Sequence, residues 1–156
     1  MKIAVTGLAI CMIVVLLATL SPTPIDRGYR PVIERFLSVL RRSGAPEWFG
    51  YHWFEFFANV LMFIPVGFFL ALMFATKFRW ISLLLVSALS ATLELAQFFF
   101  LPARFAAVDD VVANSLGGWV GVAAAALVVT LVHVRDRRVI DTWREHNLVA
   151  VRGPAQ

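Results

Sequence analysis

Apolar residues in this chain gather into four long runs that are separated by short polar or turn-forming segments. The runs cover about residues 3–20, 54–76, 81–101 and 110–134. A helix needs about 20 apolar residues to cross the hydrocarbon core of a bilayer, and each run has roughly this length. The pattern therefore predicts four membrane-spanning helices. We read the first run as an uncleaved helix, because no small-residue cleavage pattern precedes its end cleanly.

A shorter segment between the first two runs has an amphipathic pattern, at about residues 31–42. Pro31 suits the first turn of a helix, and Ser43-Gly44 suits its end. One helix face would carry the apolar side chains Val32, Phe36, Val39 and Leu40, and the other would carry Glu34, Arg35, Ser38, Arg41 and Arg42. We expect this helix to lie in the membrane interface. The aromatic residues that follow it are typical of the same level of the bilayer, and they are Trp48, Phe49, Tyr51 and Trp53.

Positively charged residues near the ends of the runs predict the orientation of the chain. Lys77 and Arg79 lie in the tight turn between the second and third runs, and Arg135, Arg137 and Arg138 follow the fourth. Cytoplasmic loops carry an excess of Lys and Arg. We therefore expect both termini in the cytoplasm, with residues 135–156 forming a polar cytoplasmic tail after the fourth helix ends.

Composition supports a membrane protein and narrows the classes of partner. The 156 residues are 60% hydrophobic and only 15% charged, with a mean hydropathy of +0.80, whereas a soluble domain is about a quarter charged. The net charge of +4 does not indicate nucleic acid, because the basic residues flank the apolar runs and form no stripe with interleaved aromatics. Cys11 is the single cysteine, so the chain can form no internal disulfide. We expect one all-α membrane domain whose main partner is the bilayer.

Acids and amides occur near the same end of three of the predicted helices. They are Glu55 and Asn59 in the second run, Glu94 and Gln97 in the third, and Asp109, Asp110 and Asn114 in the fourth. If successive helices alternate in direction, these side chains meet on one side of the bilayer, which would be the outer side. Ionisable residues inside a membrane are functional candidates, because an unpaired charge there is costly. Arg104 and His52 are the candidate partners for Glu94 on that side.

Each of these residues also has a purely structural interpretation. Glu94 and Gln97 could join helices by hydrogen bonds, and Asp109 could cap the fourth helix. Pro65 and Gly67 fit a kink in the second helix. The small residues Gly117, Gly118 and Gly121 fit close helix packing.

No catalytic motif selects a reaction. The chain has no H-E-x-x-H, no G-x-S-x-G and no phosphate-binding glycine loop. Carboxylates at Glu55, Glu94, Asp109 and Asp110 would suit a hard cation, and the same groups could act as acid and base. Because no spacing distinguishes these chemistries, the sequence assigns no catalytic residue, metal or cofactor.

Three sequence blocks carry a family resemblance. They are Asn59 with the Phe-Ile-Pro-Val-Gly-Phe segment at 63–68, Glu94-Leu95-Ala96-Gln97, and the segment at 109–118 that begins Asp109-Asp110. In this order they resemble the signature blocks of the VanZ-like family, and the resemblance covers about residues 51–131. That family is named for a protein that lowers bacterial sensitivity to the glycopeptide antibiotic teicoplanin. The resemblance implies a bacterial inner membrane, a role at the cell envelope, and recurrent residues at Asn59, Pro65, Gly67, Glu94, Gln97, Arg104, Asp109, Asp110, Asn114 and Gly117.

We therefore expect a single VanZ-like domain over residues 1–156 that binds an amphiphile at the outer leaflet. The ligand would be a lipid, a lipid-linked cell-wall precursor or a lipoglycopeptide such as teicoplanin. The expected polar floor is Glu94, Gln97, Asp110 and Asn114, and the expected aromatic flanks are Trp48, Trp53 and Phe98 to Phe100. Two alternatives remain open, namely a membrane-embedded enzyme acting on a lipid-linked substrate and an accessory structural subunit. The sequence does not indicate the oligomeric state.

Overall fold

The computed structural model describes residues 2–20, 28–46, 49–101 and 107–152, apart from the side chains of residue 142 and residues 145–152. Within these ranges the chain is all helical. The elements are α1 (Lys2–Thr19), α2 (Arg30–Arg42), α3 (Tyr51–Leu72), the short 3-10 helix η2 (Thr76–Phe78), α4 (Trp80–Phe100) and α5 (Val108–Arg152). Helices α1, α3, α4 and α5 are long and apolar enough to cross a membrane. The predicted all-α architecture with four spans is confirmed, and the chain is a multi-pass membrane protein.

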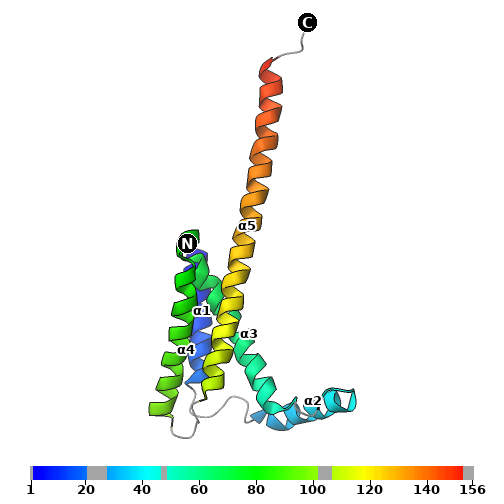
Figure 1. Ribbon diagram of the computed structural model, residues 1–156, viewed down its shortest axis with the longest axis vertical. Helices are drawn as coiled ribbons and strands as arrows, with labels where there is room; N and C mark the ends of the chain where they lie inside the picture. The colour runs from blue at the N-terminus through cyan, green and yellow to red at the C-terminus, as the bar shows by residue number, and fades with distance from the viewer. Residues whose placement is uncertain (1, 21–27, 47–48, 102–106, 153–156) are drawn as a thin grey trace.

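The four spanning helices alternate in direction and form one bundle (Figure 1). The N-terminus lies at the end of the bundle beyond which α5 projects, and we call this the termini end. Helix α2 lies at the opposite end, which we call the α2 end. Many large apolar side chains on the outer surface of the bundle are exposed, including Leu17, Leu84 and Leu127. In a membrane protein these side chains face lipid.

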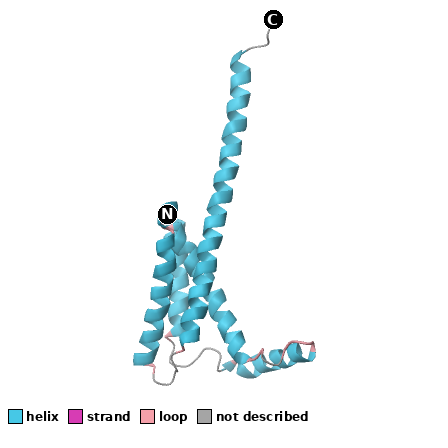
Figure 2. Cartoon of the chain, in the orientation of Figure 1, coloured by secondary structure: helices cyan, strands magenta, loops and turns pink. Residues whose placement is uncertain are grey.

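Helix α2 projects sideways from the end of the bundle, roughly at right angles to the spanning helices (Figure 2). Leu37 on its inner face is buried, while Val32 and Phe36 are exposed. Gly44 ends the helix with φ of +100°, and its N–H donates to the Arg41 carbonyl at 3.1 Å. This left-handed conformation favours glycine. An interfacial position therefore fits both the direction of α2 and its exposed apolar face.

Helix α5 differs from the prediction, which ended the fourth helix at about residue 134 and left a polar tail. The helix continues for 45 residues to Arg152. The sequence explains the continuation, because no glycine or proline occurs between Gly121 and Gly153. At 1.5 Å per residue its length is about 67 Å, roughly twice the hydrocarbon thickness of a bilayer. The prediction followed the fall in hydropathy after residue 134, whereas the helix itself ends much later.

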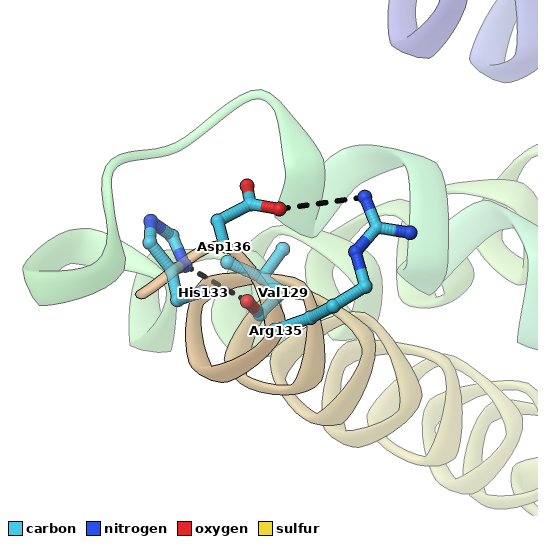
Figure 3. Close-up of polar contacts among 4 residues, drawn as sticks. All are labelled: Val129, His133, Arg135 and Asp136. Carbon is cyan, nitrogen blue, oxygen red and sulfur yellow. Dashed lines mark hydrogen bonds and ion pairs between the residues drawn. The ribbon is translucent and has the colours of Figure 1, made fainter. Parts of the chain in front are cut away.

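The polar part of α5 begins at the level of His133 (Figure 3). His133 Nδ1 lies 2.8 Å from the carbonyl oxygen of Val129, one turn earlier. Arg135 Nη2 lies 3.3 Å from Asp136 Oδ1. These side chains are exposed, which fits a helix that leaves the bundle at this point.

Glycines bring α3 and α5 into backbone contact. A Cβ atom at Gly117 would lie 2.1 Å from the Val60 carbonyl oxygen, and one at Gly121 would lie 2.0 Å from that of Ile64. A Cβ at Gly67 would lie 2.0 Å from the carbonyl oxygen of Gly118. No side chain fits at these distances, so glycine is required for this approach. Accordingly, α3 and α5 form the most extensive helix pair in the bundle.

The apolar core lies beside this pair. Val15 of α1, Phe63 and Val66 of α3, and Val86 and Leu93 of α4 form one buried cluster. A second buried cluster joins Ala71 of α3 to Val122 and Ala125 of α5. Together with the glycine contacts, these clusters hold the four helices in register and fix which polar side chains meet at the α2 end.

Candidate functional site

A cavity of about 370 Å³ opens at the α2 end of the bundle. All five α-helices or their flanking residues contribute to its wall. The polar lining residues are Thr19, Glu55, Asn59, Glu94, Gln97, Asp110 and Asn114. The apolar and aromatic lining residues are Ala18, Tyr29, Ile33, Tyr51, Phe54, Ala58, Met62 and Leu93. The wall of the cavity therefore combines a group of acids and amides with an apolar, partly aromatic surface.

The first polar contact in the cavity joins α3 to α5. Asn59 Nδ2 donates a hydrogen bond to Asp110 Oδ1 at 2.8 Å. Asn59 precedes Val60, the residue whose carbonyl touches Gly117. The close glycine contact thus brings the two helices near enough for short polar side chains to meet.

The second contact joins α4 to the end of α1. Gln97 Nε2 donates to the backbone carbonyl of Thr19 at 2.8 Å, and both residues are buried. The last carbonyl groups of a helix have no partner within that helix. Gln97 supplies one of these missing donors, so this side chain joins helices as well as lining the cavity.

The third contact places Glu94 at the start of α5. Its Oε1 accepts a hydrogen bond from the backbone N–H of Ala107, the residue before Val108. Glu94 is only 9% exposed. The N-terminus of a helix carries unpaired N–H groups and a partial positive charge, so a carboxylate is favoured there.

Asn114, another lining residue, has a side-chain oxygen that lacks a described hydrogen-bond donor. Its side chain is 4% exposed, and its Oδ1 has no hydrogen-bond partner among the described residues. The Oγ of Ser90, which lies one turn inward from Glu94 on α4, is likewise buried without such a partner. A buried acceptor without a donor costs about 1–3 kcal/mol, so these two side chains reduce the stability of the bundle locally.

Not every predicted site residue lies in this cavity. Asp109 points to the exterior, where its Oδ2 lies 3.5 Å from His52 Nε2, and both side chains are about two-thirds exposed. Successive helix residues differ by about 100° in direction, so Asp110 faces the cavity and Asp109 does not. Arg104, a predicted candidate partner for Glu94, lies outside the described residues.

The aromatic wall also differs from the prediction. Trp53 and the exposed side chains of Phe98 to Phe100 do not line the cavity, and Trp48 lies outside the described residues. Tyr29, Tyr51 and Phe54 supply the aromatic surface instead. The sequence offered one clue to these residues, because Tyr51 and Phe54 share a helix face with Glu55 and Asn59. It offered none for Thr19, Tyr29 or Ile33, whose positions depend on how α1 and α2 pack.

The acids do not form a metal-type cluster within the part of the chain that the structure describes. No three His, Cys, Asp or Glu side chains there lie close enough to share an ion. Glu94 instead accepts from the backbone N–H of Ala107, just before α5, and Asp110 accepts from the Asn59 side-chain amide of α3. Their geometry is that of a lined cavity with hydrogen-bonded walls.

The comparisons with known proteins identify the family. A model of the VanZ/LLP1 family matches residues 6–129. The chain belongs to the VanZ/LLP1 family. Neither a curated protein nor a solved structure matches it. The matched range holds every lining residue of the cavity and ends before the basic part of α5, so the cavity is built within the region that defines the VanZ/LLP1 match.

Proposed function

We propose that this VanZ/LLP1 protein binds an amphiphile, with the polar headgroup in the cavity at the α2 end. The observation that carries the proposal is the mixed wall of that cavity, in which acids and amides lie beside Ile33, Phe54 and Met62. A volume of about 370 Å³ is at the lower end of the range for small-molecule sites. It suits a headgroup and leaves acyl chains outside, in contact with lipid-facing side chains.

The proposed orientation places the cavity at the outer leaflet of a bacterial inner membrane. Lys77 and Arg79 lie at the opposite end of the bundle, and the basic segment of α5 begins there with Arg135. Positive residues near the ends of spans favour the cytoplasm. This supports cytoplasmic termini, with α2 lying in the outer interface.

The finer proposal concerns the kind of ligand. At the outer leaflet the available amphiphiles are membrane lipids, lipid-linked cell-wall precursors and lipoglycopeptides such as teicoplanin. Occupancy of the cavity by one of these would lower glycopeptide sensitivity. The family membership and the mixed polar and apolar wall of the cavity support this proposal.

The test is a paired measurement on Glu94→Gln. This change keeps the size of the side chain and an oxygen that can accept from Ala107, but it removes the negative charge from the cavity. Thermal stability of the purified variant and glycopeptide susceptibility of cells at matched expression are measured together. We expect a folded variant with reduced protection.

Asp136→Asn is the matched control, because it removes one exposed acid from α5 outside the cavity. We expect it to leave protection unchanged. Full protection by a stable Glu94→Gln variant would contradict the proposal.

The structural-subunit alternative has one specific observation in its favour, which is the hydrogen bond from Gln97 to the Thr19 carbonyl. A residue used only to join helices affects function only through lost protein. If Glu94→Gln and Gln97→Ala lower protection solely in proportion to lost stability, the structural role is supported and the binding site is not.

A further inference from the structure

A second, smaller pocket lies at the termini end of the bundle, opposite the cavity described above. Its volume is about 240 Å³, which is below the range of most small-molecule sites and suits one small polar group. The lining residues come from the turn between α3 and α4 and from α5, and they are Thr76, Arg79, Val129, Thr130, His133, Val134 and Arg137. We infer that this pocket binds a phosphate group. The inference does not rest on the proposed function, because the two sites share no lining residue.

The pocket exists because α5 continues past the turn between α3 and α4. Val129, His133 and Arg137 follow at intervals of four residues along α5, which places them on one helical face. Arg79 is the last residue of the turn, between η2 and the start of α4. A fourth helix that ended at about residue 134 would not hold Arg137 in this wall. The continuation of α5 thus brings two arginines from distant parts of the sequence to one pocket.

The wall of this pocket is positively charged. None of the described lining residues is acidic. Asp136, which precedes Arg137, lies 3.3 Å from Arg135 instead. No described carboxylate pairs with Arg79 or Arg137. Arg79 is half-buried, so its guanidinium is partly removed from water, and an anion bound here would offset that cost.

The hydrogen-bond donors of the wall suit the oxygens of a phosphate. A guanidinium presents a planar fork of N–H groups that matches phosphate geometry, and hydrogen bonds between charged groups are the strong ones. Thr76 adds a hydroxyl from the turn. The Thr130 hydroxyl is used within α5, where it donates to the Ala126 carbonyl at 2.8 Å. His133 Nδ1 lies 2.8 Å from the Val129 carbonyl oxygen (Figure 3), so the two arginines remain the main donors.

The pocket lies at the level where phospholipid headgroups are expected. The exposed aromatic side chains of Phe78 and Trp80 flank Arg79 in the sequence, and such residues are typical of the membrane interface. Val129 and Val134 give the pocket an apolar side on which an acyl chain can pack. Basic pockets between spanning helices on the cytoplasmic side bind anionic headgroups, and in the orientation proposed above this end faces the cytoplasm. The phosphate would come from an anionic lipid or from solution, and the experiment separates these sources.

The experiment compares an anionic lipid with a zwitterionic one. Delipidated protein is incubated with phosphatidylglycerol or phosphatidylcholine of the same acyl chains, and bound lipid is counted by native mass spectrometry. Both headgroups contain a phosphate, but the arginines repel the quaternary ammonium of phosphatidylcholine. We expect phosphatidylglycerol to be retained about tenfold more strongly. Binding of inorganic phosphate to the same protein without lipid is measured by isothermal titration calorimetry.

Three variants assign the preference to the pocket. Arg79→Gln and Arg137→Gln each remove one positive charge from the wall, and we expect each to lower the ratio between the two lipids by about fivefold. Arg137 is exposed, so its replacement tests the site even if Arg79→Gln does not fold. Arg144→Gln is the matched control, because it removes an exposed arginine of the same helix outside the pocket. It should keep the wild-type ratio.

The outcomes distinguish a pocket from a diffuse positive charge, and one source of phosphate from the other. A lipid preference that Arg137→Gln lowers and Arg144→Gln retains assigns the pocket to an anionic lipid. Inorganic phosphate that binds the wild type but not Arg137→Gln, without a lipid preference, keeps the phosphate site and assigns it to a ligand from solution. Equal loss in Arg137→Gln and Arg144→Gln would overturn the inference, because any charge near the membrane would then suffice. Absence of both the lipid preference and phosphate binding would also overturn it.

Discussion

Asn59 on α3 and Asp110 on α5 form a hydrogen bond of 2.8 Å at the α2 end of the bundle, directly beside the backbone contact between Val60 and Gly117. The polar pair and the glycine contact belong to one interface. The glycines set the separation of the two helices, and that separation allows Asn59 and Asp110 to meet. The cavity therefore depends on small residues that lie outside it.

The glycine contacts between α3 and α5 predict that any added side chain will lower the free energy of unfolding. Gly117→Ala would place Cβ 2.1 Å from a backbone carbonyl, so α3 and α5 must separate. We expect a loss of about 2 kcal/mol or more, measured by thermal or denaturant unfolding in detergent. Gly28→Ala is the control, because nothing lies within 4 Å of its Cβ position. Equal stability of the two variants would contradict the close packing of α3 on α5.

The Asn59–Asp110 hydrogen bond predicts that substitutions at the two residues will have non-additive effects on the free energy of unfolding. Asn59→Ala, Asp110→Ala and the double variant form a double-mutant cycle, which isolates the pairwise contribution from the other contacts of either residue. We expect a coupling of about 0.5–1.5 kcal/mol, as for other hydrogen bonds between membrane helices. Strictly additive effects on unfolding would show that the two side chains do not interact.

Asn114 predicts a gain in stability when its polar group is removed. Because its buried Oδ1 has no described partner, replacement by leucine removes an unsatisfied acceptor. We expect Asn114→Leu to stabilise the delipidated protein by about 1 kcal/mol, measured by unfolding in detergent. A destabilised variant would show that the Asn114 side chain contributes favourable contacts to the folded protein.

We expect the part of α5 that projects beyond the bundle to contribute little to the stability of the bundle. Residues 135–141, for which burial is described, are all exposed, so they add little to the bundle. A chain that ends at Arg138 keeps the basic cluster that orients the protein. We expect its stability to change by less than about 0.5 kcal/mol. A large loss would show that the segment packs on another copy or on a partner.

Much of the fold follows from patterns in the sequence, because membrane spans and amphipathic faces are local. Apolar runs placed four helices, and the alternation of residues on α2 placed its two faces. The length of α5 was missed because hydropathy falls at Arg135 while the absence of glycine and proline lets the helix continue. A hydropathy pattern shows where apolar residues stop, but it does not show where a helix stops.

The candidate site was harder to predict, because its details depend on how distant helices pack. Asp109 and Asp110 have the same chemistry and adjacent positions, yet only Asp110 faces α3. The choice depends on the rotation of α5, which Gly117 and Gly121 fix through contacts with Val60 and Ile64. Thr19 entered the site only because α1 ends beside Gln97.

The most direct test of the account fills the cavity without removing a polar group. Ala58 lines the cavity and is itself exposed, so Ala58→Phe should occupy the space that a headgroup needs and leave the fold intact. Ala123→Phe adds the same side chain at an exposed position of α5 outside the cavity. Lipid retention by the two delipidated variants is compared by native mass spectrometry at equal Tm. The account predicts that Ala58→Phe loses bound lipid and Ala123→Phe keeps it, whereas equal retention would contradict an amphiphile site in this cavity.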